Sequence, residues 1–198
     1  EEAEEEEERA ISPSHRLLRG RGGLSAAGLD SIQRHMQTFA PSGIVDLSER
    51  GLTVLTPEVL DLGLLKAHVA DIFELDLHAN CLVQIHRRLL QPLVGLRTLD
   101  LSHNGLAELP EAALLPALTS LDLSHNMLDG MGASAELCAQ RLPALRVLRL
   151  AHNRLKFMPA GVAGLAALRD LDLSSNLIAH AQGEEPLRGT PLLERLSL

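Results

Sequence analysis

The chain has 198 residues, of which 45% are hydrophobic, 22% are charged and only 2% are aromatic, with no Trp or Tyr. The formal net charge is −8, but residues 1–9 hold seven glutamates and one arginine, which leaves 19 acidic against 17 basic residues in the remainder. This near-neutral balance, the missing stacking rings and the lack of an apolar run of roughly 20 residues argue against a nucleic-acid or membrane partner.

The N-terminal region divides into two segments. The glutamate run and the "SPSHRLLRGRGG" that follows predict a disordered acidic/basic tail over residues 1–23, because blocks of like charge repel each other. Residues 24–41 predict a capping helix, since Leu29, Ile32 and Met36 fall on one helical face. We expect this helix to cover the end of the core that follows.

Residues 42–198 repeat one pattern, L-x-x-L-x-L-x-x-N-x-L, about six times. Full copies begin at Ile72, Leu96, Leu118, Leu145 and Leu168, after a degenerate copy at Ser42 and before a fragment at Leu193. The asparagine position holds all five asparagines of the chain: Asn80, Asn104, Asn126, Asn153 and Asn176. Spacings of 22 to 27 residues between full copies predict that each copy is one layer of a stacked structure.

Each copy predicts a short parallel strand, a bend and a return path. The x-L-x-L segment alternates polar and apolar residues, as a strand with one buried face does. The inward asparagine is expected to bond backbone groups that the bend leaves without partners. Arg50 replaces it in the first copy, which is therefore either a degenerate end repeat or irregular. Pro110 and Pro159 predict a turn or a short helical segment on the return paths.

These copies resemble the leucine-rich repeat. The "L-P-x-x-x-x-x-L" pattern of the return paths is similar to that of intracellular members of the family. The resemblance implies an α/β fold, a leucine-rich repeat solenoid shaped as a curved arc, with a parallel sheet on the concave face and short helices or turns on the convex face. It also implies a non-catalytic module or scaffold that binds a protein partner on the concave face. The alternative is the regulatory arm of a larger signalling enzyme, such as a kinase or small GTPase.

The family resemblance places binding residues at exposed positions in and around each strand, which gives three columns. One lies between the two strand leucines, one lies two positions earlier, and one directly precedes the asparagine. Arg149 and two residues beside the columns, Phe73 and Arg97, are the best anchors in a face without Trp or Tyr. The expected contact residues are Phe73, Glu74, Asp76, Arg97, Thr98, Asp100, His103, Ser120, Asp122, His125, Arg149, His152, Asp170 and Asp172.

Two interpretations of the aspartate column stay open. In the first, aspartate is simply the commonest residue at this position of the repeat. In the second, Asp76, Asp100 and Asp122 form an acidic surface, interrupted by Arg149, for a partner of complementary charge. The longer loop 129–140 is a second candidate contact surface.

The chemistry-bearing residues predict neither catalysis nor a cofactor. The three in-line histidines suggest a metal site, but side chains on successive strands point the same way and need not converge on one ion. Phosphate-loop, H-E-x-x-H and C-x-x-C signatures are missing from the sequence. Cys81 and Cys138 are expected to be buried or half-buried thiols, in a monomeric cytoplasmic protein, with a nuclear location as the alternative.

Overall fold

A computed structural model describes residues 42–55, 69–108, 114–129, 140–178, 187 and 189–198. The expected tail (1–23) and capping helix (24–41) lie outside the described residues, as do residues 130–139 of the longer loop.

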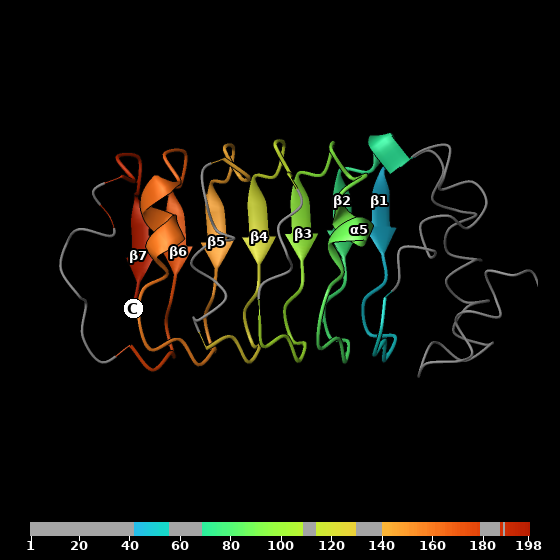
Figure 1. The fold of residues 1–198 in the computed structure, drawn as a ribbon, viewed down its shortest axis with the longest axis horizontal. Helices are drawn as coiled ribbons and strands as arrows, with labels where there is room; N and C mark the ends of the chain where they lie inside the picture. Colours follow the sequence, from blue (N-terminus) through green and yellow to red (C-terminus); the bar gives the residue numbers. More distant parts are fainter. Residues whose placement is uncertain (1–41, 56–68, 109–113, 130–139, 179–186, 188) are drawn as a thin grey trace, which may run out of the picture.

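In the described part of the chain, seven three-residue strands form one parallel sheet in which strand order follows chain order (Figure 1). The strands are β1 (Ile44–Asp46), β2 (Glu74–Asp76), β3 (Thr98–Asp100), β4 (Ser120–Asp122), β5 (Val147–Arg149), β6 (Asp170–Asp172) and β7 (Arg195–Ser197). Residues at the same place in successive repeats are Cα partners in every pair. The predicted solenoid and its register are therefore confirmed.

Short helical segments lie between strands, on the return side of the solenoid. They are η2 (Val69–Asp71), α5 (Arg87–Leu90) and η3 (Ala160–Gly164). Figure 1 shows α5 in front of the sheet, and its Leu89 and Leu90 are buried. Pro159 directly precedes η3, which confirms the short helical segment expected there. None of the helices in the described part of the chain has the length and apolar character of a membrane-spanning segment.

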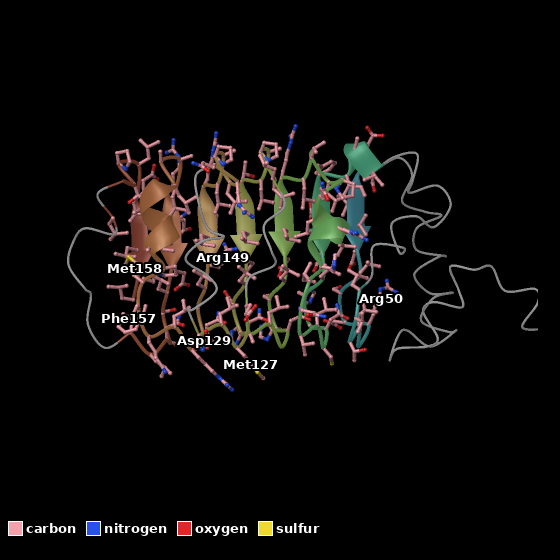
Figure 2. The ribbon with its side chains drawn as sticks, in the orientation of Figure 1. Arg50, Met127, Asp129, Arg149, Phe157 and Met158 are labelled. Atoms are coloured by element: carbon pink, nitrogen blue, oxygen red, sulfur yellow. The ribbon has the colours of Figure 1, made fainter. Side chains whose placement is uncertain are left out.

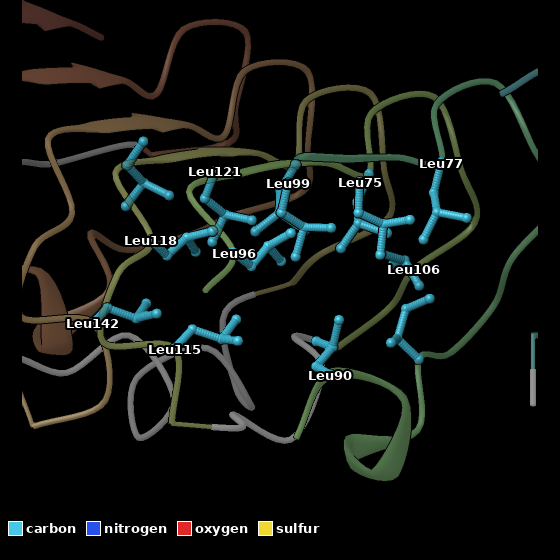
Figure 3. Packing of buried hydrophobic residues seen from close by; sticks show 14 of the residues in the cluster. Leu75, Leu77, Leu90, Leu96, Leu99, Leu106, Leu115, Leu118, Leu121 and Leu142 are labelled. Atoms are coloured by element: carbon cyan, nitrogen blue, oxygen red, sulfur yellow. The ribbon is translucent and has the colours of Figure 1, made fainter. Parts of the chain in front are cut away.

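A leucine-rich core fills the space between the sheet and the return segments (Figure 3). The middle residue of each strand from β1 to β6 is buried, and so is the leucine that follows the strand. Full burial of one such side chain contributes roughly 1.5–3 kcal/mol. Because the same positions are buried in each of these layers, one core runs across the repeats and each layer depends on its neighbours.

The first copy is regular in its backbone, although Arg50 replaces the asparagine. β1 pairs with β2 in register. Glu49 has a φ of 54°, within the range of 52° to 55° found at the same place in the next five copies. The backbone N–H of Arg50 donates to Oδ1 of Asn80 at 3.1 Å, so the second copy supplies an acceptor to the first. The expected alternatives were a degenerate end repeat or an irregular one, and this regular backbone argues against an irregular copy.

The expectation of a buried or half-buried thiol is wrong for Cys81, which is exposed. Asn80 points inward and is buried, so the next residue along the bend points outward. Cys138 lies outside the described residues.

Candidate protein-binding surface

The sheet face is the side of the sheet turned away from the leucine core. Successive side chains of a strand alternate between faces, so the first and third residues of each strand point toward it. The register aligns them in two columns, with neighbours about 4.8 Å apart. The columns are Ile44, Glu74, Thr98, Ser120, Val147, Asp170 and Arg195, and Asp46, Asp76, Asp100, Asp122, Arg149, Asp172 and Ser197.

Each aspartate of the second column holds the bend that follows its strand. Oδ1 of Asp100 accepts the backbone N–H of Ser102 at 2.8 Å and the Ser102 hydroxyl at 2.7 Å. The same backbone bond, at 2.9 Å, recurs at Asp46, Asp76, Asp122 and Asp172. The aspartates therefore have a structural role that neither sequence interpretation included, and this role uses one of the two carboxylate oxygens.

Asp100→Ala should lower the free energy of unfolding by about 0.5–1.5 kcal/mol, because the Ser102 N–H loses its acceptor. Asp100→Asn should stay close to wild type, since the amide keeps an oxygen at the Oδ1 position. Urea denaturation of the two variants measures the difference. An equal loss in both would mean that the carboxylate charge, and not this hydrogen bond, holds the bend.

β5 departs from this pattern because it has no carboxylate acceptor and no polar side chain at the second position. Arg149 stands in the aspartate position, and Ala151 stands where a serine or histidine follows the aspartates. Nη1 of Arg149 lies 3.5 Å from Oδ2 of Asp122, and these side chains are 50% and 18% exposed. An ion pair of this length and exposure contributes little to stability. Arg149, labelled in Figure 2, is thus a basic side chain set between Asp122 and Asp172.

The inward asparagines bond the backbone of two consecutive repeats. Nδ2 of Asn126 donates to the carbonyls of Leu101, Leu123 and Ser124 at 2.9, 3.1 and 3.2 Å, and Oδ1 accepts the Leu106 N–H at 3.0 Å. Leu101 and Leu106 belong to the preceding repeat. Equivalent bonds across the repeat boundary occur at Asn80, Asn104, Asn153 and Asn176. Each amide thus fixes the bend that presents the third column.

The residue before each asparagine, and before Arg50 in the first copy, has a left-handed backbone. This third column is Glu49, Ala79, His103, His125, His152 and Ser175, with φ between 52° and 55°. Histidine is among the residues enriched in that conformation. The backbone N–H of each histidine donates to a carbonyl of the next repeat at 2.9 Å, so successive bends are tied together.

The three histidine rings form a parallel stack, called the histidine stack below. The ring centroids of His103 and His125 are 4.0 Å apart, and those of His125 and His152 are 4.1 Å apart, with interplanar angles of 12° and 13°. All three side chains are exposed. Within the described chain, three or more His, Cys, Asp or Glu side chains are nowhere grouped in a way that could hold a metal ion.

Two histidines near the sheet face have pKa values shifted in opposite directions. Burial against its neighbours lowers the pKa of His125, and positive charge on His103 or His152 lowers it further, while Asp122 opposes the shift. A hydrogen bond from Nδ1 of His78 to Oδ1 of Asp76 at 2.9 Å raises the pKa of His78 against the effect of its own burial. The negative charges of Asp76, Asp100 and Glu49 add to this rise.

Titration by NMR should therefore place His78 above, and His125 below, the ordinary histidine pKa of about 6.5. His78 should stabilise the fold fully below that value, and this contribution should be lost as the pH rises through its folded pKa. His125 should behave in the opposite sense, because the folded state binds its proton less well than the unfolded state does. His78→Gln assigns the first signal. If His78 and His125 titrated with the same midpoint, the opposite pKa shifts expected from their contacts would be contradicted.

The predicted anchors lie at different places around the sheet face. The exposed Phe73 packs its ring over Gly43, where an added Cβ would come within 2.5 Å of ring atoms and where φ is +70°. Arg97 is exposed at the start of β3. Arg146 and Arg169 occupy the same repeat position, and Arg169 forms an ion pair with Glu194. Only Arg97 of this basic column was among the expected contact residues, although each arginine directly follows the first leucine of its copy.

Exposed apolar side chains beyond the C-terminal ends of the strands were not foreseen. Met127 and Phe157 are exposed there, as Figure 2 shows at the lower edge of the view. Met127 follows an inward asparagine directly, as Cys81 does. For Met127 the signal was the outward position after its asparagine, which the three columns left out. Phe157 lies four residues after Asn153 and does not share that position.

Comparisons with known proteins bear on the fold. A family model described as "Leucine rich repeat" matches residues 116–178, and one described as "Leucine Rich repeats (2 copies)" matches residues 94–131. The comparison with curated proteins finds no match. Among solved structures, the leucine-rich repeat domain of APL1B is similar, with a TM-score of 0.59 and 21% identity, covering 77% of this chain and 42% of that chain. At this identity the likeness shows the fold alone, and the present chain spans less than half of the APL1B chain.

Proposed function

The chain is a leucine-rich repeat protein, and we propose that it is a non-catalytic scaffold module that binds a protein partner through the sheet face. Leucine-rich repeats are typically interaction domains. The observation that carries the proposal is the periodic presentation of polar and charged side chains on seven in-register strands. The monomeric state and the cytoplasmic setting belong to the same proposal, supported by the sequence alone.

The charges of the sheet face support a partner of mixed, complementary charge. Asp76, Asp100 and Asp122 occupy three consecutive strands, and Arg149 follows on the fourth. Arg97 adds a basic group at the start of β3. Complementary charge mainly sets specificity and association rate, so these residues select the partner more than they hold it.

The size of the sheet face also suits a protein partner. A specific complex buries about 1,200–2,000 Å² in total, which side chains from several adjacent strands can supply. The two sheet-face columns hold no Trp, Tyr or Phe, and aromatic residues are frequent hot spots. We therefore expect the affinity to be spread over many contacts.

Affinity capture from cell lysate, quantified by mass spectrometry, tests the proposal. The wild-type chain is compared with a variant carrying Asp100→Asn, Asp122→Asn and Arg149→Gln. The two asparagines keep the Oδ1 acceptors of the bends, so the variant changes charge while the fold is retained. Partners that depend on the sheet face should be depleted from the variant.

A matched control removes the same charges elsewhere. It carries Asp71→Asn, Glu108→Gln and Lys156→Gln, which are exposed residues outside the three columns and outside the loop 129–140. The control should retain the proteins that the sheet-face variant loses. Equal recovery with all three forms, or depletion from the control alone, would contradict binding through the sheet face.

A further inference from the structure

The histidine stack ends beside a small side chain. In the third column His103 is preceded by Ala79, whose side chain stops at Cβ. His103 stacks on His125 through one face of its ring. The other face is turned toward the repeat of Ala79, and within the described chain it has no ring stacked on it. The column therefore has no ring at Ala79, which is the next position along the stack.

A carboxylate lies on the far side of that position. Glu49 is the third-column residue of the preceding repeat, and its side chain is 76% exposed. The backbone N–H of Ala79 donates to the Ser102 carbonyl and that of Glu49 to the His78 carbonyl, both at 3.0 Å, which fixes the three bends one repeat apart. With about 4.8 Å per repeat, a planar group above Ala79 would lie between the His103 ring and the Glu49 carboxylate.

A guanidinium has the properties that this arrangement requires. It is flat, it stacks on aromatic faces, and its N–H groups pair with carboxylates. An ammonium group has no plane to stack. Nε2 of His78 lies 3.6 Å from Oε1 of Glu49, and the charges of Asp76 and Asp100 act on His78. Arg50 directly follows Glu49 in the chain. The carboxylates favour a cation, whereas protonated His78 opposes it.

We propose that the open end of the histidine stack is a subsite for an arginine side chain of the partner. The guanidinium stacks on His103 above Ala79 and pairs with Glu49. The inference rests on the proposed function and names the chemistry of one partner residue.

NMR titration with N-acetyl-arginine methylamide tests the subsite without the partner. At about pH 8, above the ordinary histidine pKa of about 6.5, the probe should cause a saturable shift of the His103 ring signals. N-acetyl-lysine methylamide should bind about 2- to 5-fold more weakly, because it gains charge pairing but no stacking. The absence of a His103 shift, or equal affinity for the two probes, would overturn the subsite.

Paired variants locate the binding. Ala79→His places a ring in the unfilled position and should abolish the shift of His103. The backbone there has the φ that three histidines of this chain already adopt, so the fold should tolerate the change. Ser175→His makes the same change at the other end of the stack and should leave binding at His103 intact. Wild-type binding by the Ala79→His variant would overturn the proposal.

Two further variants test the subsite if the Ala79→His variant does not fold. His103→Asn removes the ring, keeps a residue suited to left-handed backbone and should abolish binding, which Gly105 signals next to the bend would report. Glu49→Gln should weaken binding of the arginine probe. Wild-type affinity in either variant would count against the subsite. Because the probe is a small molecule, these outcomes are independent of whether a protein is captured through the sheet face.

Discussion

Leu123→Ala should lower the free energy of unfolding by about 2–5 kcal/mol, the range for truncation of a buried leucine. Leu123 directly follows β4 and its side chain is 0% exposed within the leucine core. Its carbonyl accepts Nδ2 bonds from both Asn126 and Asn153, so the backbone there has little freedom to move into the cavity. The layers before and after should loosen together. Urea denaturation and hydrogen exchange measure both effects.

Leu177→Ala is the matched control for this prediction. Leu177 directly follows an inward asparagine, and its side chain is 59% exposed. The same truncation there should change stability by less than about 0.5 kcal/mol. If the two variants unfolded at the same urea concentration, the assignment of buried and exposed positions in the repeat would be incorrect.

Asn126→Ala should lower the free energy of unfolding by roughly 2–5 kcal/mol, because a stranded buried group costs about 1–3 kcal/mol and this side chain serves several. The Leu106 N–H loses its acceptor, and the carbonyls of Leu101 and Leu123 lose a donor. Asn126 is itself buried, so water replaces these bonds poorly. Thermal unfolding followed by circular dichroism measures the loss.

Asn126→Asp distinguishes the contribution of the Nδ2 donor from that of the Oδ1 acceptor. It keeps the shape and the Oδ1 acceptor but replaces the Nδ2 donor with an oxygen facing carbonyl oxygens. The variant should therefore be strongly destabilised at neutral pH and partly recover in acid, where protonation removes the charge and restores a donor. A loss below about 0.5 kcal/mol in Asn126→Ala would show that the asparagine bonds do not hold consecutive repeats together.

The strand register could be predicted from sequence because each layer imposes the same constraints on the chain. A leucine core requires an apolar side chain at fixed places, and the bend requires an inward amide. Alignment on Asn80, Asn104 and Asn126 therefore also aligned the strands that precede them. The same reasoning failed to settle whether the first copy was regular, because Arg50 takes part through its backbone N–H, which every residue except proline has.

The turn-holding bond of the aspartates was visible in the sequence but was not interpreted. Asp100 and Asp122 are each followed two residues later by serine, whereas Arg149 is followed by Ala151. Both side chains therefore differ in β5, although the backbone N–H at the second position is still present. The sequence alone indicates the charge of these positions, since spacing does not reveal that the backbone N–H at the second position bends back onto the carboxylate.

The histidine stack could be predicted only as a column. Register places His103, His125 and His152 in line, but parallel rings at 4.0 and 4.1 Å also require the left-handed backbone before each asparagine. The same conformation at Ala79 leaves a ring position unfilled. A sequence pattern carries no backbone angle, so neither the stack nor its open end was foreseen.

Site-specific photo-cross-linking is the most direct test of the central claim that the sheet face binds a protein. A photo-reactive amino acid is placed at Ser120, in the middle of the sheet face, or at Val94, an exposed residue between α5 and β3. We expect Ser120 to yield cross-linked protein adducts from lysate and Val94 to yield few. Adducts at Val94 without adducts at Ser120 would place the contact on the return side and contradict the account.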